Sequence, residues 1–118
     1  AIPVFYGATS AGKKPFFQIS LAEYSFHRAL QSGSLNHLAF PATAKSLFDI
    51  DAVEYVSFFF KETSSSYLSE LKTRAKDAGV KNLLIMVSRE GSLATPNEAE
   101  RLKAIDNHLK LLDAAAFL

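Results

Sequence analysis

The chain has 118 residues, of which 48% are hydrophobic and 21% charged, an ordinary composition for a globular domain. With 13 Lys and Arg against 12 Asp and Glu, the formal net charge of +1 indicates no basic surface for nucleic acid or an anionic membrane. No apolar run approaches the roughly 18 residues of a membrane span. Because Cys is absent, disulfides, thiol nucleophiles and thiolate metal sites are excluded.

The first half of the domain predicts one strand and two helices. Residues 16–20 form a short apolar run rich in aromatic side chains, which is typical of a buried strand. Mixed helical spacing over residues 21–31, followed by Gly33, predicts a helix closed by glycine. Pro41 then predicts a second helix over residues 42–48, because proline fits the first helical turn.

The second half predicts two strands that are each followed by a helix. Residues 52–60 are β-branched and aromatic almost throughout, and residues 82–87 form another apolar strand. Between them, apolar spacing over residues 67–78 predicts an amphipathic helix with Gly79 at its C-terminus. Residues 95–98 (TPNE) combine a capping box with proline at the first helical position, so a last helix is expected to begin there.

Alternation of apolar strands with helices predicts an α/β fold with a parallel sheet. We interpret residues 1–14, which contain Gly and Pro breakers without a periodic pattern, as a leader, and residues 15–118 as the domain. The apolar stripe of the last helix continues to the final residues, so we expect a longer α/β protein cut after its third βα unit. Its unpartnered surface should make the chain alone oligomeric or poorly soluble.

Five stretches of the chain resemble the N-terminal part of a known enzyme family. They are residues 19–28 (ISLAEYSFHR), 51–57 (DAVEYVS), 82–91 (NLLIMVSREG), 100–108 (ERLKAIDNH) and 112–118 (LDAAAFL). The family is that of the sugar phosphate isomerases and epimerases, the xylose-isomerase-like TIM barrels. The resemblance covers most of residues 16–118 and implies the first three βα units of a (β/α)8 barrel, with parallel strands and covering helices.

The resemblance also implies a chemistry. Members of the family move a proton next to the carbonyl of a sugar or sugar phosphate, assisted by a divalent metal such as Mn, Mg or Zn. The Glu, Asp and His side chains that hold the metal, and the catalytic carboxylates, lie on later strands that this chain does not contain. The catalytic residues are therefore unknown, and the resemblance leaves both the bacterial cytoplasm and export after signal removal open as locations.

Four residues are candidates for substrate binding, because function in a barrel collects at the carboxyl ends of the strands. Glu54 is a carboxylate within an apolar strand, and we expect it to face the barrel interior, where it accepts substrate hydroxyls or pairs with a Lys or Arg of a neighbouring strand. Arg89 follows the third strand, where it either binds an anionic group of the substrate or is an ordinary solvent-exposed charge in the loop. Ser88 and Glu90 flank it, although relatives tend to have an acidic residue in place of Ser88.

The histidines do not form a metal-binding pattern. His27, His37 and His108 are too far apart in sequence for two of them to ligate one metal from a single helix. His27 follows Glu23 by four residues, so a helix through both would place them on one face as an ion pair.

A binding or assembly module without catalytic activity is the alternative function. The aromatic residues 58–60 fit either stacking on a sugar ring or ordinary core packing. The open edge of a three-stranded sheet is also able to pair with a partner. We expect a sugar or sugar phosphate as ligand, no nucleic acid, no membrane span, and either a second copy or the remainder of the barrel as partner.

Overall fold

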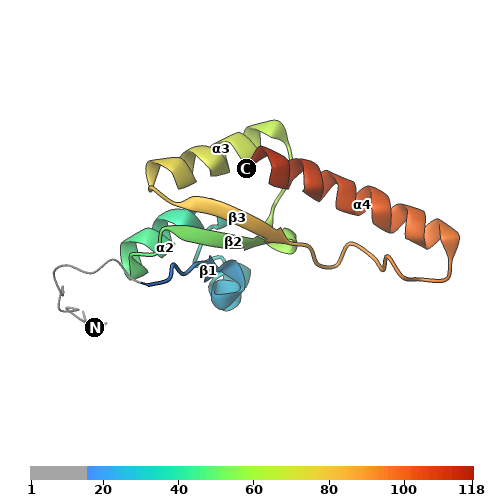
Figure 1. Cartoon of the computed structure of the whole chain (residues 1–118), viewed down its shortest axis with the longest axis horizontal. Helices are drawn as coiled ribbons and strands as arrows, with labels where there is room; N and C mark the ends of the chain where they lie inside the picture. The colour runs from blue at the N-terminus through green and yellow to red at the C-terminus, as the bar shows by residue number, and fades with distance from the viewer. Residues whose placement is uncertain (1–15) are drawn as a thin grey trace.

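A parallel three-stranded sheet lies at the centre of the computed structural model, which describes residues 16–118 (Figure 1). The strands β1 (Leu21–Ala22), β2 (Ala52–Val56) and β3 (Lys81–Met86) lie side by side in the order β1-β2-β3. Both neighbouring pairs are parallel, which confirms the predicted α/β class and parallel sheet. The leader predicted for residues 1–14 lies outside the described residues.

Helices occupy every connection between the strands and follow the last of them. Both connections between strands also include a short 3-10 turn, labelled η, beside the α-helices. In chain order the helical segments are η1 (Glu23–Phe26), α1 (His27–Ser32), η2 (His37–Ala39), α2 (Phe40–Phe48), η3 (Ser57–Phe59), α3 (Ser65–Asp77) and α4 (Glu98–Phe117). The predicted alternation of strands and helices is therefore confirmed.

The helix ends follow the capping residues. Gly33 adopts a φ of 77° directly after α1, and Gly79 adopts a φ of 70° one residue beyond the cap of α3, so both occupy the left-handed region where glycine has no steric cost. Pro41 lies in the first turn of α2, where its missing N–H is not needed. The Ser64 side chain accepts a hydrogen bond from the Tyr67 N–H and starts α3.

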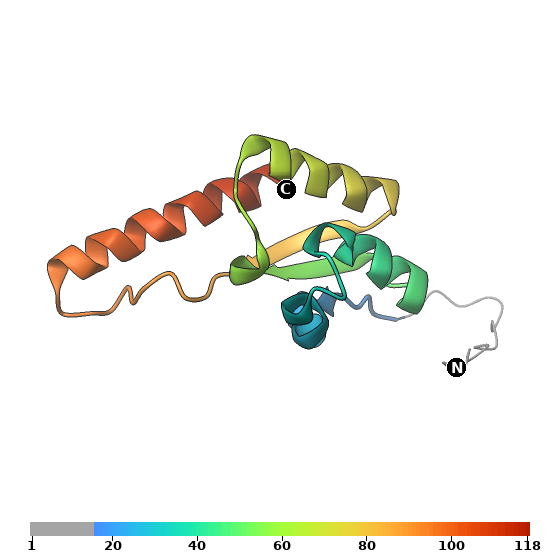
Figure 2. The same ribbon diagram turned by 180° about the vertical axis from the view of Figure 1, so that it is seen from behind.

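The helices pack on one face of the sheet and enclose the core. Val53 and Tyr55 of β2 are at most 1% exposed and pack with Phe40 and Ala44 of α2 and Leu71 of α3. Figure 2 shows α2 and α3 alongside the strands. Because alternate strand residues point to opposite faces, Val53 and Tyr55 lie on the covered side, as predicted.

The opposite face of the sheet carries Glu54 among apolar, exposed side chains. The register pairs Glu54 with Leu84, after a bulge in β3 opposite the step from Val53 to Glu54. Leu84 and Met86 are 47% and 46% exposed on this strand. Val56, on the same side by alternation, is buried, but the part around Glu54, Leu84 and Met86 is open, and this side of the sheet is called the uncovered face.

Helix α4 runs back from a long loop, with Ala104 buried against that loop and the C-terminal end beside α3 (Figure 1). The Lys72 ammonium of α3 donates to the Phe117 carbonyl and lies 4.8 Å from the centre of the Phe117 ring. The stripe predicted to be unpartnered is exposed, with Leu109 50% and Leu112 61% accessible. Leu109 and Leu112 are therefore open to solvent, whereas Phe117 at the end of the same stripe contacts Lys72.

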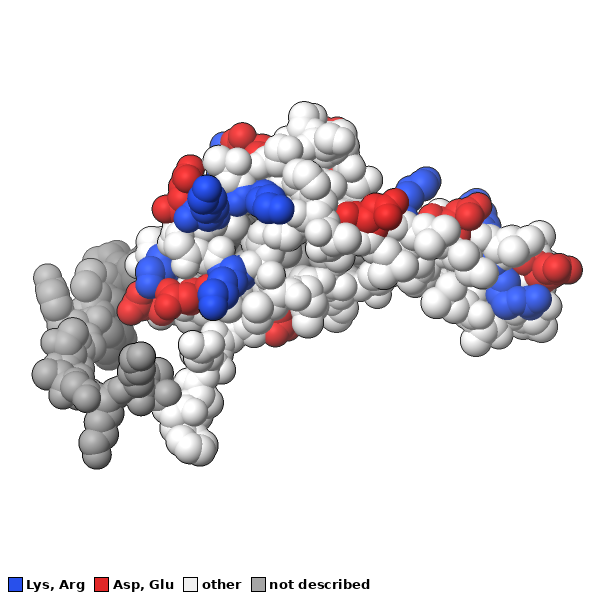
Figure 3. Space-filling view, turned by 45° about the horizontal axis from the view of Figure 1, so that its top comes forward, with Lys and Arg blue, Asp and Glu red and all other residues white. Residues whose placement is uncertain are grey.

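Charged side chains are interspersed on the surface. Figure 3 shows Lys and Arg beside Asp and Glu on the visible face. Lys45 pairs with Asp49 at 2.6 Å and Asp51 at 2.5 Å, and Arg74 pairs with Glu70 at 2.7 Å. Such exposed pairs contribute little to stability, because water and salt screen the charges. Among residues 16–118, no helix combines the length and the apolar character needed to cross a membrane.

The first strand was predicted too early in the chain. Residues 16–20 are not a strand, and Phe16 and Phe17 are 102% and 69% exposed. Leu21 pairs with Val53, only one residue into β2, so the residues before Leu21 soon run past the start of the neighbouring strand. An apolar run without a pairing partner does not form a strand.

Three further boundaries differ from the predictions. The helix expected over residues 21–31 begins later, because Leu21–Ala22 form β1 and a 3-10 turn precedes α1. The strand expected over residues 52–60 ends at Val56, where the chain turns into η3. The capping box at residues 95–98 is wrong, because the Asn97 side chain accepts from the Glu100 N–H and caps α4.

Candidate functional site

The carboxyl ends of the three strands bring together residues that are far apart in sequence. Tyr24 follows β1, Phe58 follows β2 and Arg89 follows β3. In a parallel sheet these ends lie at one edge, where α/β proteins bind their ligands. This edge is therefore the candidate functional site.

An aromatic shelf, formed by Tyr24, His27, Phe58 and Arg89, lies at this edge. The Tyr24 and His27 rings stack with centroids 4.8 Å apart, and Tyr24 meets Phe58 edge-on at 6.5 Å. The Arg89 guanidinium lies 4.1 Å from the centre of the Phe58 ring. Tyr24 is 50% exposed and Arg89 is also exposed, so the shelf presents rings and one cation to solvent.

The loop that carries Arg89 is held by hydrogen bonds. The buried Ser57 hydroxyl accepts from the Ser88 N–H at 2.9 Å and donates to the Ser88 carbonyl at 3.0 Å. The Asn107 side chain of α4 donates to the Glu90 carbonyl at 3.2 Å. Arg89 itself has a φ of 68°, an uncommon conformation for a residue other than glycine. The predicted residues Ser88 and Glu90 thus contribute backbone groups that orient Arg89.

Glu54 lies on the uncovered face, as expected from strand alternation. The Ser20 hydroxyl donates to Glu54 Oε1 at 2.5 Å, and the carboxylate is half-buried. None of the ion pairs among residues 16–118 involves Glu54, so the pairing with a Lys or Arg of a neighbouring strand is not observed there. Glu54 keeps a carboxylate oxygen for a ligand on this face.

A buried polar cluster behind this edge was not anticipated from the sequence. Glu23 is 0% and His37 4% exposed, and Glu23 Oε1 lies 3.4 Å from His37 Nε2. Glu23 Oε2 accepts from the Val56 N–H at 2.9 Å, and His37 Nδ1 lies 2.6 Å from the Tyr67 hydroxyl. These contacts join the end of β1, the end of β2, η2 and α3.

The predicted ion pair between Glu23 and His27 is wrong. His27 Nδ1 instead contacts the Tyr24 carbonyl at 2.9 Å. Glu23 begins a 3-10 turn, in which side chains repeat every three residues, so residues four apart do not share a face there. His37 is the partner of Glu23, and their separation of 14 residues gave no local signal.

Burial dominates the electrostatics of this cluster. It raises the pKa of Glu23 to about 8, against the opposing effect of the Val56 N–H. It lowers the pKa of His37 to about 4, and the positive charge of Lys61 acts in the same direction. Burial also raises the pKa values of Tyr55 and Tyr67, with the Glu23 charge adding to both effects.

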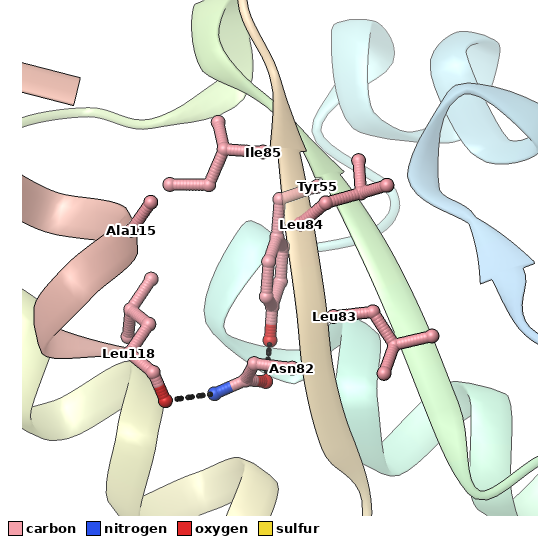
Figure 4. A pocket seen from close by; sticks show the side chains of 7 residues that line it. All are labelled: Tyr55, Asn82, Leu83, Leu84, Ile85, Ala115 and Leu118. Carbon is pink, nitrogen blue, oxygen red and sulfur yellow. Dashed lines mark hydrogen bonds between the residues drawn. The ribbon is translucent and has the colours of Figure 1, made fainter. Parts of the chain in front are cut away.

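A small cavity of about 40 Å³ lies between β3 and the end of α4. Figure 4 shows that Asn82 links its two walls, accepting from the Tyr55 hydroxyl at 2.7 Å and donating to the Leu118 carbonyl at 3.4 Å. Because these polar groups are paired with one another, the cavity is a packing feature of the fold.

The divalent metal implied by the family resemblance has no matching ligand set in the described chain. Among residues 16–118, no group of three or more His, Cys, Asp or Glu side chains is arranged to hold a metal ion. No protein-family model matches the chain, and a search of curated proteins finds no match either.

Proposed function

We propose that residues 16–118 form the first three βα units of a barrel-type enzyme that binds a sugar or sugar phosphate and moves a proton next to its carbonyl. The observation that carries the proposal is Glu54, a carboxylate on the uncovered face of a parallel sheet whose other face is covered by helices. In a closed barrel, that uncovered face is the interior. The resemblance to the sugar phosphate isomerases and epimerases supports the same class of function.

The residues at the site have chemistry suited to such a ligand. Glu54 is an acceptor for sugar hydroxyls, with Ser20 orienting its other oxygen. Arg89 offers the planar, forked donors that bind a phosphate through two hydrogen bonds. The Phe58 and Tyr24 rings supply flat apolar surfaces for the C–H face of a sugar ring. In the proposed enzyme, these residues therefore bind and orient the ligand.

Binding of a phosphorylated and an unphosphorylated ketose tests the proposal. We expect fructose 6-phosphate and fructose to shift the amide resonances of residues at the carboxyl ends of the strands. The variant R89Q should weaken fructose 6-phosphate binding by roughly tenfold or more, since a charge-assisted bond is lost, and leave fructose unaffected. The variant E54Q should weaken both ligands by about tenfold.

The variant R74Q is the matched control for R89Q. Arg74 is also an exposed arginine, but it pairs with Glu70 on α3, away from the strand ends. If R74Q and R89Q weakened fructose 6-phosphate binding equally, the effect of Arg89 would come from the net charge of the protein and not from a specific contact. Absence of any shift with either sugar at millimolar concentration would contradict the proposed function.

Exposed apolar surface supports the alternative, an assembly module. Leu84 and Met86 on the uncovered face and Leu109 and Leu112 on α4 are each 46–61% exposed. Large apolar side chains exposed in groups are typical of interaction sites. We expect sedimentation to show self-association of the chain and the double variant L109K/L112K to reduce it. A wild-type monomer at high concentration would remove this alternative.

A further inference from the structure

The buried pair of Glu23 and His37 has no part in the proposed ligand site. We propose that these two residues share one buried proton and form a proton-operated clamp, which holds the carboxyl ends of β1 and β2 to η2 and α3. Gain of a second proton or loss of the shared one would leave a charge in the protein interior and open the clamp.

The geometry of the two side chains supports a shared proton. Glu23 Oε1 and His37 Nε2 lie 3.4 Å apart, and neither of these two buried atoms makes a hydrogen bond with any other group or within the pair. The outer atoms of both groups are occupied, Glu23 Oε2 by the Val56 N–H and His37 Nδ1 by the Tyr67 hydroxyl. A proton held between the two inner atoms gives the pair a donor and an acceptor, and so offers each atom the partner that it lacks.

Moving the proton across this pair changes no total charge. With the proton on Glu23 Oε1, the carboxylic acid faces a neutral imidazole whose Nδ1–H donates to the Tyr67 oxygen. With the proton on His37 Nε2, the same pair is a carboxylate facing an imidazolium. Both forms bind one proton, so the clamp is most stable with one proton present.

Few other titratable groups surround the pair. Tyr55 of β2 and Tyr67 of α3 face Glu23, and Lys61 in the connection after η3 acts on His37, while Glu62 acts on Tyr67. The centres of the Phe60 and Tyr55 rings lie 4.5 Å and 5.6 Å from that of the His37 ring and cover part of it with apolar surface. Both tyrosines remain neutral below pH 10, because burial raises their pKa values.

A cavity provides a route for protons to reach the pair. Its volume is about 150 Å³, enough for several water molecules, and it opens beside His37. Leu30, Gly33, Leu35, Asn36, Phe59 and Lys61 form the remaining walls. Exchange with solvent therefore occurs at the His37 end, while Glu23 is fully buried.

The two pKa shifts have opposite effects on stability. The raised pKa of Glu23 means that the folded state retains a proton the unfolded state releases, so stability falls as pH rises from about 4.5 to 8. The lowered pKa of His37 means that the unfolded state binds the extra proton, so stability rises from about pH 4 to 6.5. The two effects on stability cancel between about pH 4.5 and 6.5, and stability falls from about pH 6.5 to 8.

Urea unfolding as a function of pH separates the two residues. Each measurement is compared with the control variant E70Q, which removes a half-exposed carboxyl on α3. We expect the unfolding constant of this control to rise by up to about 30-fold between pH 6.5 and 8. The variant E23Q should lose this rise and gain stability from pH 4 to 6.5, whereas H37Q should lose stability continuously from about pH 4.5 upward.

Carbon-13 and nitrogen-15 resonances of the wild-type chain give a second test that needs no variant to fold. The Glu23 carboxyl should remain protonated at pH 6.5 and titrate near pH 8, and the His37 ring should remain neutral down to about pH 4. A Glu23 carboxyl that titrates near pH 4.5, or equal pH profiles for E23Q and E70Q, would overturn the proposal.

Discussion

Replacing Ser57 by Ala tests how the loop that carries Arg89 is held at the end of β3. The Ser57 hydroxyl accepts from the Ser88 N–H at 2.9 Å and donates to the Ser88 carbonyl at 3.0 Å, so the variant removes two hydrogen bonds. Ser57 is 5% exposed, and water does not readily replace its hydroxyl. At about 1 kcal/mol net for each bond, we expect S57A to destabilise this loop by about 2 kcal/mol.

Hydrogen exchange at the Ser88 amide measures this effect directly. A loss of about 2 kcal/mol corresponds to roughly 30-fold faster exchange of that amide when it opens locally. The control S66A removes a hydroxyl that contacts only Ser64 on the surface at 3.1 Å, and it should leave the Ser88 amide unchanged. If the Ser88 amide of S57A exchanged at the wild-type rate, the two hydrogen bonds of Ser57 would not stabilise the loop.

The remaining predictions concern packing and the glycine in the same loop. The variant L71A should lower the free energy of unfolding by about 3 kcal/mol in urea, because Leu71 is fully buried among α2, β2 and α3. L112A should change it by less than about 0.5 kcal/mol, and a larger loss would show that the α4 stripe is covered in solution. G91A should cost about 1–2 kcal/mol by the same assay, since Gly91 has a φ of 92° and an added Cβ would lie 3.1 Å from the Ala104 Cβ. If G91A unfolded at the same urea concentration as the wild type, the close contact with Ala104 would be contradicted.

The strands β2 and β3 were predictable because each is long enough, and apolar enough, to be recognised from its own residues. β2 is apolar except for Glu54 and β3 is apolar from Leu83 to Met86, and both strands start within two residues of the predicted position. β1 has only two residues, Leu21–Ala22, too few to show any periodicity. The aromatic residues before it gave the stronger signal, yet they lie outside the sheet because β2 offers them no partner.

The parts of the site that depend on neighbouring residues were predictable, and those that depend on contacts between distant residues were not. Strand alternation placed Glu54 on the face opposite Val53 correctly, since it depends only on neighbouring residues. The contact of Glu23 with His37 depends on how η2 returns to the end of β1, which no local pattern encodes. The role of Ser57 in holding Ser88 is equally non-local, because 31 residues separate them.

The parallel order of the strands also constrains how the chain folds during synthesis. Leu21 pairs with Val53, which is made 32 residues later, and Ala52 pairs with Lys81, made 29 residues later. At typical ribosomal rates, each strand waits roughly 2–6 s for the residues that bond to it. No hairpin is able to shorten that interval, because parallel strands require a complete crossover. Cotranslational folding therefore pairs β1 with β2 first, and the edge of β2 stays open until β3 leaves the ribosome.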